Sequence, residues 1–247
     1  MESQNQQFQE WLAIAREAGW GAAEILVNAE HSDLEIQDAE GEPVTAADVA
    51  ANTYIVETLQ ARLNNQNFAY LTEETFKIEQ DNARLDAAYV WVIDPLDGTK
   101  DFIQKNGEYA VHIALVHNHR PVLAVVVRPA VERLYFAIVG RGAFVEAKDG
   151  TIAPVQVSQR RQLDELIVVT SRSHRSDRFN QLMQQFPCQM QKPVGSLGGK
   201  FAAIVEQDAD VYVSLSGTSA PKDWDLAAPE LILSEAGGKL TRIEGTP

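Results

Sequence analysis

Cysteine is nearly absent from this chain of 247 residues, in which Cys188 is the only one. A single thiol excludes an intrachain disulfide and any zinc or iron–sulfur site built from several cysteines. Long apolar runs are also missing, and the polar, Gln-rich start from Met1 to Glu10 lacks the basic and apolar regions of a signal peptide. These absences predict a cytoplasmic protein without a membrane partner.

Basic residues are scarce relative to acidic ones. The chain contains 21 Lys and Arg against 35 Asp and Glu, which gives a formal net charge of −14. This balance argues against binding of a nucleic-acid polymer or an anionic membrane, because both require a positive face. A phosphorylated substrate would need local positive charge, most simply from bound divalent cations.

The periodicity of apolar residues predicts helices and strands in an order typical of an α/β protein. In the first part, two helices precede a short strand that ends in a tight loop, and an antiparallel meander follows. These elements are expected at Gln6–Asn28, Ala46–Leu63 with Thr45 as N-cap, Tyr89–Ile93, Tyr109–Val116, Pro121–Arg128 and Leu134–Val139.

Strands and helices alternate in the second part of the chain. They are expected at Leu166–Thr170, Asp177–Phe186, Gly199–Glu206, Ala209–Leu215 and Asp225–Glu235. Pro154 and the polar run that follows it interrupt the pattern, which predicts subdomains at residues 1–155 and 156–247.

Several common catalytic motifs do not occur. The sequence has no G-x-S-x-G, H-E-x-x-H, G-x-G-x-x-G or C-x-x-C, and Gly199-Lys200 lacks the upstream glycine of a phosphate-binding P-loop. What remains is a set of acidic residues at the ends of predicted elements.

Asp94 and Asp97 flank a proline at the end of a predicted strand. Both carboxylates and the Leu96 carbonyl could turn toward one point, and such hard oxygen donors suit Mg²⁺ or Mn²⁺. Asp and Gly also favour ordinary turns, so this string by itself fits a turn and a metal loop equally well. Elsewhere, His112 lies inside a predicted strand, where a packing or interface role is expected.

Four motifs together resemble the inositol monophosphatase superfamily of Mg²⁺-dependent, lithium-sensitive phosphatases. They occur in the family's order and span Thr45 to Gly238. The motifs are Asp48 within Pro43–Asp48, then Glu73-Glu74, then Trp91–Thr99, and then Trp224–Ala228 ahead of Glu235–Gly238.

The resemblance implies an α/β, α+β layered fold, an αβαβα sandwich with the metal site between subdomains. It implies that two or three Mg²⁺ ions, which Mn²⁺ could replace, are held by Glu73, Asp94, the Leu96 carbonyl, Asp97 and Asp225. It also implies that Asp48 and Thr99 orient and deprotonate the attacking water, with Glu74 holding water outside the metals' own ligands. The amides of Gly98 and Thr99 would donate to the phosphate; Thr99 could also be a plain N-cap of a short helix, and both roles could hold together.

A narrower resemblance, to 3'(2'),5'-bisphosphate nucleotidases of the CysQ type, is carried by Asp97–Ile103, Lys105–Tyr109 and Ser171–His174. It implies removal of the 3'-phosphate from 3'-phosphoadenosine 5'-phosphate, a by-product clearance step of sulfate assimilation. The implied substrate-binding residues are Gly98, Thr99, Ser171, His174, Ser196, Lys200 and Asp225. Lys200 would offset a second phosphate, whereas His174 could equally be a surface residue.

Two departures from the pattern bear on this narrower match. The segment Gly195–Lys200 has a spacing that does not align readily with the family's serine-rich segment, and relatives are expected to continue past Pro247, so the chain could be truncated there. The alternatives are an inositol or sugar monophosphatase, fructose 1,6-bisphosphate included, and more remotely a non-catalytic scaffold. The expected partner is a small bisphosphonucleotide or polyol phosphate, and the expected assembly is a monomer or a homodimer.

Overall fold

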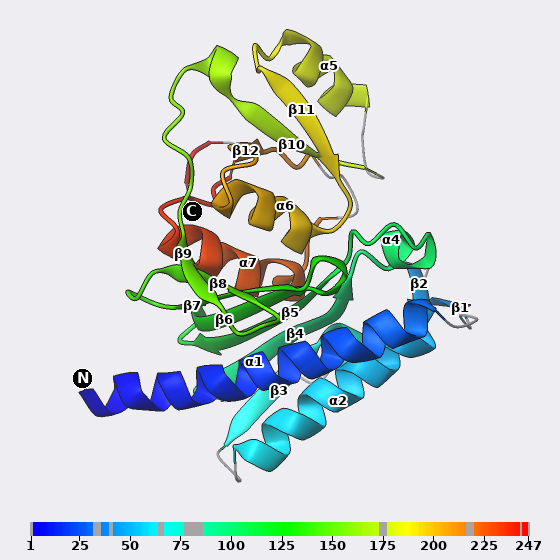
Figure 1. Cartoon of the computed structure of the whole chain (residues 1–247), viewed down its shortest axis with the longest axis vertical. Helices are drawn as coiled ribbons and strands as arrows, with labels where there is room; N and C mark the ends of the chain where they lie inside the picture. The colour runs from blue at the N-terminus through cyan, green and yellow to red at the C-terminus, as the bar shows by residue number, and fades with distance from the viewer. Residues whose placement is uncertain are drawn as a thin grey trace.

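The chain folds into five alternating layers of helix and sheet, as the computed structural model shows (Figure 1). Helices α1 and α2 cover one face of a large sheet, α6 and α7 separate that sheet from a small one, and α5 lies outside the small sheet. The expected αβαβα sandwich is therefore confirmed. The structure describes residues 2–31, 36–39, 42–63, 67–76, 86–172, 177–215, 220–242 and 244–246.

The large sheet has seven strands in the order β3-β4-β5-β6-β7-β8-β9, and only the β3–β4 pair is parallel. Its strands are β3 (Phe68–Thr72), β4 (Tyr89–Asp97), β5 (Ala110–His117), β6 (Arg120–Arg128), β7 (Arg133–Ile138), β8 (Ala143–Ala147) and β9 (Ile152–Val155). The small sheet, in the order β11-β10-β12, is parallel and consists of β10 (Ile167–Ser171), β11 (Met190–Val194) and β12 (Val211–Tyr212). A hairpin of β1 (Ile36–Ala39) and β2 (Glu42–Thr45) precedes both sheets.

The helices are α1 (Glu2–Glu30), α2 (Ala46–Arg62), α3 (Glu73–Phe76), α4 (Thr99–Ile103), α5 (Asp177–Gln185), α6 (Leu197–Val205) and α7 (Asp223–Glu235), with short 3₁₀ turns η2 (Pro129–Val131) and η3 (Leu163–Glu165). Thr45 caps α2 as expected, because its side chain accepts from the Ala47 amide.

Side chains along the central strands alternate between the two faces of the large sheet, so the apolar residues form two separate cores. On β5, Val111, Ile113 and Leu115 pack toward α1 and α2, whereas Ala110 and Ala114 pack toward α6 and α7. The small alanines allow α6 and α7 to approach the sheet closely. Side chains at the ends of these helices can therefore reach the end of β4.

The expected tight loop after Ile93 is wrong, because β4 continues through Pro95 and Leu96 to Asp97. Its pairing with β5 shifts register between Asp94 and Asp97. Such a bulge re-aims side chains at the end of a strand, and it accommodates Pro95, which cannot donate to a ladder.

Other differences lie in the second part of the chain. The strand expected at Ala209–Leu215 is only Val211–Tyr212, and the sequence pattern did not predict β11, which is mostly exposed and so lacks an apolar face. Helix α7 packs against β4, β5, β6 and β7 of the large sheet. The division at residues 155 and 156 stays a prediction, since the chain leaves the large sheet there but returns to it with α7.

Asp210 joins the segment between the two sheets to β10. Its carboxylate accepts from the Ile167 amide at 2.7 Å, from the Arg160 guanidinium at 2.9 Å and from the Ser158 hydroxyl. Burial raises the pKa of Asp210, but the three hydrogen-bond donors stabilise its ionised form more strongly. The pKa of Asp210 therefore lies below its ordinary value.

We expect Asp210→Asn to destabilise the protein most at neutral pH. A depressed pKa in the folded state adds stability above the unfolded-state pKa of about 4, and this contribution is lost as pH falls through the lower folded-state value. Urea unfolding from pH 7 to pH 2.5 should show the difference between wild type and variant shrinking below about pH 4. Asp208→Asn, at an exposed ion pair with Lys192, is the control. A stability difference between wild type and Asp210→Asn that stays constant with pH would contradict the prediction.

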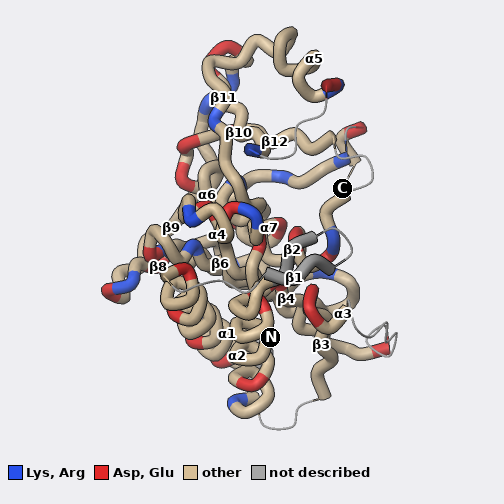
Figure 2. Tube along the Cα trace, turned by 90° about the vertical axis from the view of Figure 1, so that its right-hand side faces the viewer, with Lys and Arg blue, Asp and Glu red and all other residues tan. Residues whose placement is uncertain are grey.

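Charges of both signs are distributed over the part of the chain that the structure describes. Acidic and basic positions are interspersed along the trace in the view of Figure 2. Among the described residues, no helix is both long enough and apolar enough to cross a membrane.

Candidate active site

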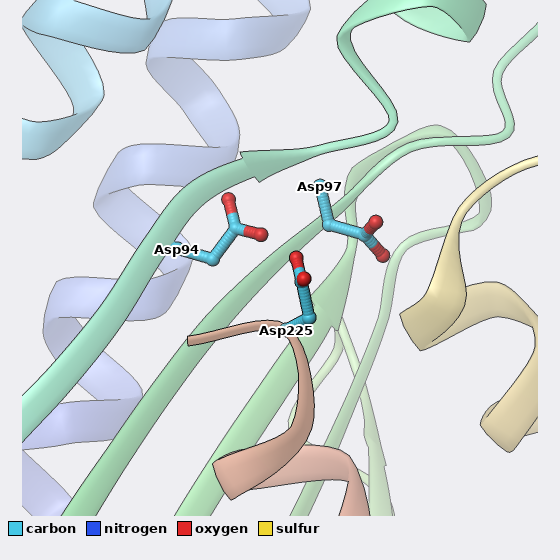
Figure 3. Close-up of side chains that lie close together, drawn as sticks. All are labelled: Asp94, Asp97 and Asp225. Atoms are coloured by element: carbon cyan, nitrogen blue, oxygen red, sulfur yellow. The ribbon is translucent and has the colours of Figure 1, made fainter. Parts of the chain in front are cut away.

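Three aspartates from two distant segments meet at the end of β4. Asp94 and Asp97 come from the bulged end of this strand, and Asp225 comes from the first turn of α7 (Figure 3). One carboxylate oxygen from each residue lies within 4.8 Å of the other two. Backbone amides orient two of the groups, because Leu96 N donates to Asp94 at 3.0 Å and Lys222 N donates to Asp225 at 2.6 Å.

The closely spaced carboxylates of this cluster favour binding of a cation. Asp94 is almost fully buried, and burial together with the charges of Glu73, Asp97 and Asp225 raises its pKa well above the ordinary value. Burial and the neighbouring Asp97 raise the pKa of Asp225 to about 6. Ionised carboxylates at such separations repel one another unless positive charge lies among them, and oxygen donors of this kind fit a hard divalent cation.

Asp97 has partners of its own on the side of α6. The Gly198 amide donates to Asp97 Oδ2 at 2.7 Å, and His112 Nε2 lies 3.2 Å from the same oxygen. Burial alone would raise the pKa of Asp97, but His112, Lys200 and the Gly198 amide outweigh it, so the pKa lies below its ordinary value. Asp97 is therefore the member of the cluster that stays ionised most readily.

A second group, Asp48 with Thr99, adjoins the cluster. The Thr99 hydroxyl lies 3.4 Å from Asp48 Oδ1 and 3.2 Å from the Leu96 carbonyl oxygen. Thr45 anchors the other Asp48 oxygen through its amide, at 2.8 Å, and through its hydroxyl. Burial raises the pKa of Asp48 above its ordinary value, although the bonds from Thr45 oppose this shift.

Gly98 and Ser196 bring the turn after β4 against the start of α6. Gly98 has a φ of 91°, which a side chain would disfavour, and an added Cβ would lie 3.1 Å from Ser196 Cβ. Ser196 caps α6, accepting from the Gly199 amide at 2.9 Å. The two predicted substrate residues thus lie against each other, and Gly98 directly follows Asp97 of the cluster.

Lys200, a residue of α6, is buried and not exposed to solvent. Its ammonium donates to the Ser196 carbonyl at 3.0 Å and to the Gly195 carbonyl, and it lies 5.5 Å from the centre of the Tyr212 ring. Burial lowers the pKa of Lys200, whereas nearby carboxylates, Asp97 foremost, oppose the change. Its predicted contact with a second phosphate stays a prediction.

The remaining predicted residues lie around this centre with less defined geometry. Glu73 and Glu74 begin α3; the charge of Glu73 acts on Asp94 and Asp225, and that of Glu74 acts on Asp48. Ser171 is buried at the end of β10. His174 lies outside the described residues. Their roles stay predictions.

The sequence interpretation missed two features at this site. His112, expected to be a packing or interface residue, lies directly against Asp97. This contact follows from the strand register, which places His112 opposite Asp94 on β4. Glu108 binds Arg172 at 2.6 Å and the Gly195 amide at 2.6 Å, which ties β10 to the segment before α6. No local sequence signal reveals that pair, since the two residues are far apart in the chain.

Comparison with known proteins identifies the class of protein that this fold and site define. The profile of the inositol monophosphatase family matches residues 7–247. The chain belongs to the inositol monophosphatase family and is a phosphatase, and membership implies a divalent metal cofactor.

The chain is similar to individual nucleotidases and to an inositol monophosphatase of this family. The chain is 34% identical over 235 residues to the 3'(2'),5'-bisphosphate nucleotidase CysQ of Salmonella typhimurium, covering 94% of this chain and 89% of that one. The crystal structure of CysQ from Bacteroides thetaiotaomicron superposes with a TM-score of 0.73 at 30% identity, covering 92% of this chain and 86% of that one. The inositol monophosphatase from Anabaena superposes with a TM-score of 0.76 at 27% identity, covering 98% and 87%.

Proposed function

We propose that this protein is a Mg²⁺-dependent phosphatase that hydrolyses the 3'-phosphate of 3'-phosphoadenosine 5'-phosphate to give AMP. The observation that carries the chemistry is the cluster of Asp94, Asp97 and Asp225 beside the Asp48–Thr99 pair. The substrate class rests on the similarity to relatives named 3'(2'),5'-bisphosphate nucleotidases.

The aspartate cluster would hold two or three Mg²⁺ ions, with Glu73 and the Leu96 carbonyl as further ligands. Bound Mg²⁺ supplies positive charge that neutralises phosphoryl oxygens and makes water more acidic. The amide-held orientations of Asp94 and Asp225 fix the direction of their free oxygens before any ligand arrives. Preorganisation of this kind lowers the cost of binding the substrate's phosphate.

Asp48 and Thr99 would activate the attacking water. Because the Thr99 hydroxyl faces Asp48 Oδ1, it can accept a proton from water while passing its own to the carboxylate. Thr45 holds Asp48 in place, and the raised pKa of Asp48 brings its basicity closer to neutral pH. Glu74 would hold water near this pair, and the amides of Gly98 and Thr99 would donate to phosphate oxygens.

An inositol or sugar monophosphatase is the second candidate. It is favoured by the structural likeness to the Anabaena inositol monophosphatase, and the same catalytic residues would serve it. Phosphate release with Mg²⁺ should therefore be measured side by side on 3'-phosphoadenosine 5'-phosphate, inositol 1-phosphate and fructose 1,6-bisphosphate. We expect the highest kcat/KM on the bisphosphonucleotide; a higher value on either of the others would overturn the proposed substrate.

Lys200 provides a sharper test of substrate choice. If its ammonium contacts the phosphate that is not cleaved, Lys200→Met removes a charge-assisted contact and keeps the volume of the buried stem. We expect kcat/KM to shift by about ten- to a hundredfold toward inositol 1-phosphate relative to the bisphosphonucleotide. Equal losses on both substrates would instead assign Lys200 to the Gly195 and Ser196 carbonyls that it binds here.

A further inference from the structure

His112 is a fully buried imidazole at the metal end of the large sheet. It lies on β5, directly opposite Asp94 on β4, and its side chain has no exposed surface. Its neighbours on the same face are Ala110 and Ala114, both buried against α6 and α7. A polar ring enclosed among apolar residues is costly unless its nitrogens are hydrogen-bonded.

The ring faces one specific oxygen. Nε2 lies 3.2 Å from Asp97 Oδ2, and within the described part of the chain neither ring nitrogen makes a hydrogen bond of good geometry. Because the nearest acceptor to Nε2 is a carboxylate, a proton on Nε2 satisfies the pair best. The Gly198 amide donates to the same oxygen at 2.7 Å, so this amide and the imidazole both lie against Oδ2.

Gly198 makes this arrangement sterically possible. A Cβ at position 198 would lie 2.4 Å from His112 Nε2 and 2.8 Å from the Ala110 Cβ. Only glycine lets the first turn of α6 approach closely enough to share Asp97 Oδ2 with the imidazole. The glycine and the histidine thus form one unit around the carboxylate.

We propose that His112 is a positioning residue, which together with the Gly198 amide fixes Asp97 Oδ2 so that Oδ1 is presented to the divalent metal. This inference rests on the proposed function, because it takes Asp97 as a metal ligand. Residues that hydrogen-bond a ligating carboxylate fix its orientation, and losing one weakens metal affinity by about 10- to 100-fold.

The test compares two replacements of His112 in the full chain. His112→Leu removes the donor and keeps an apolar side chain, whereas His112→Gln places an amide N–H where Nε2 lies. His117→Leu, on the same strand but stacked on Tyr89 at its other end, is the matched control. Metal-free proteins would be titrated with Mg²⁺ and with Mn²⁺ by isothermal titration calorimetry, and urea unfolding in chelator would report folding separately.

We expect His112→Leu to raise the Kd for the metal by about 10- to 100-fold, His112→Gln to stay within about threefold of wild type, and His117→Leu to match wild type. Wild-type affinity in His112→Leu, or equal losses in His112→Leu and His112→Gln, would overturn the positioning role and leave the proposed function intact. Failure of the wild-type protein to bind either metal would overturn both.

A spectroscopic measurement tests the same role without substitution. Long-range ¹H–¹⁵N correlation spectra of the wild-type protein should show His112 protonated on Nε2, with that nitrogen's signal moving on addition of Mg²⁺. A ring protonated on Nδ1 alone would contradict the proposal, because Nε2 could not then donate to Asp97.

Discussion

Replacing Asp94 with asparagine should reduce phosphatase turnover by more than about a hundredfold, since losing a mere outer-shell partner of a metal already costs about 10- to 100-fold. The substitution preserves volume, and the amide oxygen can still accept from the Leu96 N–H. It also removes a buried charge that Glu73, Asp97 and Asp225 repel, so the metal-free variant should unfold at a urea concentration no lower than wild type.

The measurement pairs phosphate release in Mg²⁺ with urea unfolding in chelator. Asp164→Asn, at an exposed position in η3, is the control and should match wild type in both. Turnover near wild type in Asp94→Asn would mean that the end of β4 is structural. A large fall in stability would mean that the lost activity reflects unfolding.

Metal removal should have the second large effect. Excess chelator is expected to abolish activity, and Mg²⁺ or Mn²⁺ should restore it. Without a cation, carboxylate oxygens of Asp94, Asp97 and Asp225 lie within 4.8 Å of one another and repel. Ca²⁺ is larger and accepts looser geometry, so it should occupy the site and inhibit. Full activity in excess chelator would contradict the proposed chemistry.

Stability provides an independent measurement of the same binding. A ligand that binds only the folded state raises the free energy of unfolding by about 2.7 kcal/mol at 100 times its Kd. Mg²⁺ should therefore raise the urea midpoint of the wild-type protein and shift that of Asp94→Asn much less. An equal shift in both proteins would show that the cation binds elsewhere.

Local patterns in the sequence were sufficient for much of this protein. Apolar periodicity predicted α1, α2 and the β5–β7 meander, because each depends on which face of a nearby segment is buried. The spacing of Asp94 and Asp97 by itself fitted a turn and a metal loop equally well, whereas the order of four motifs indicated the family. Short or exposed elements such as β11 lacked such a pattern, and their form depends on neighbouring strands.

The motif resemblance grouped distant acidic residues in one site, but only the tertiary structure decided how they come into contact. Asp225 reaches Asp94 and Asp97 only because small alanines on β5 let α7 pack closely on the sheet. His112 reaches Asp97 because strand register sets it opposite Asp94 and because Gly198 leaves room for the ring. Register and close packing arise from contacts between segments far apart in the chain, so no local pattern of residues encodes them.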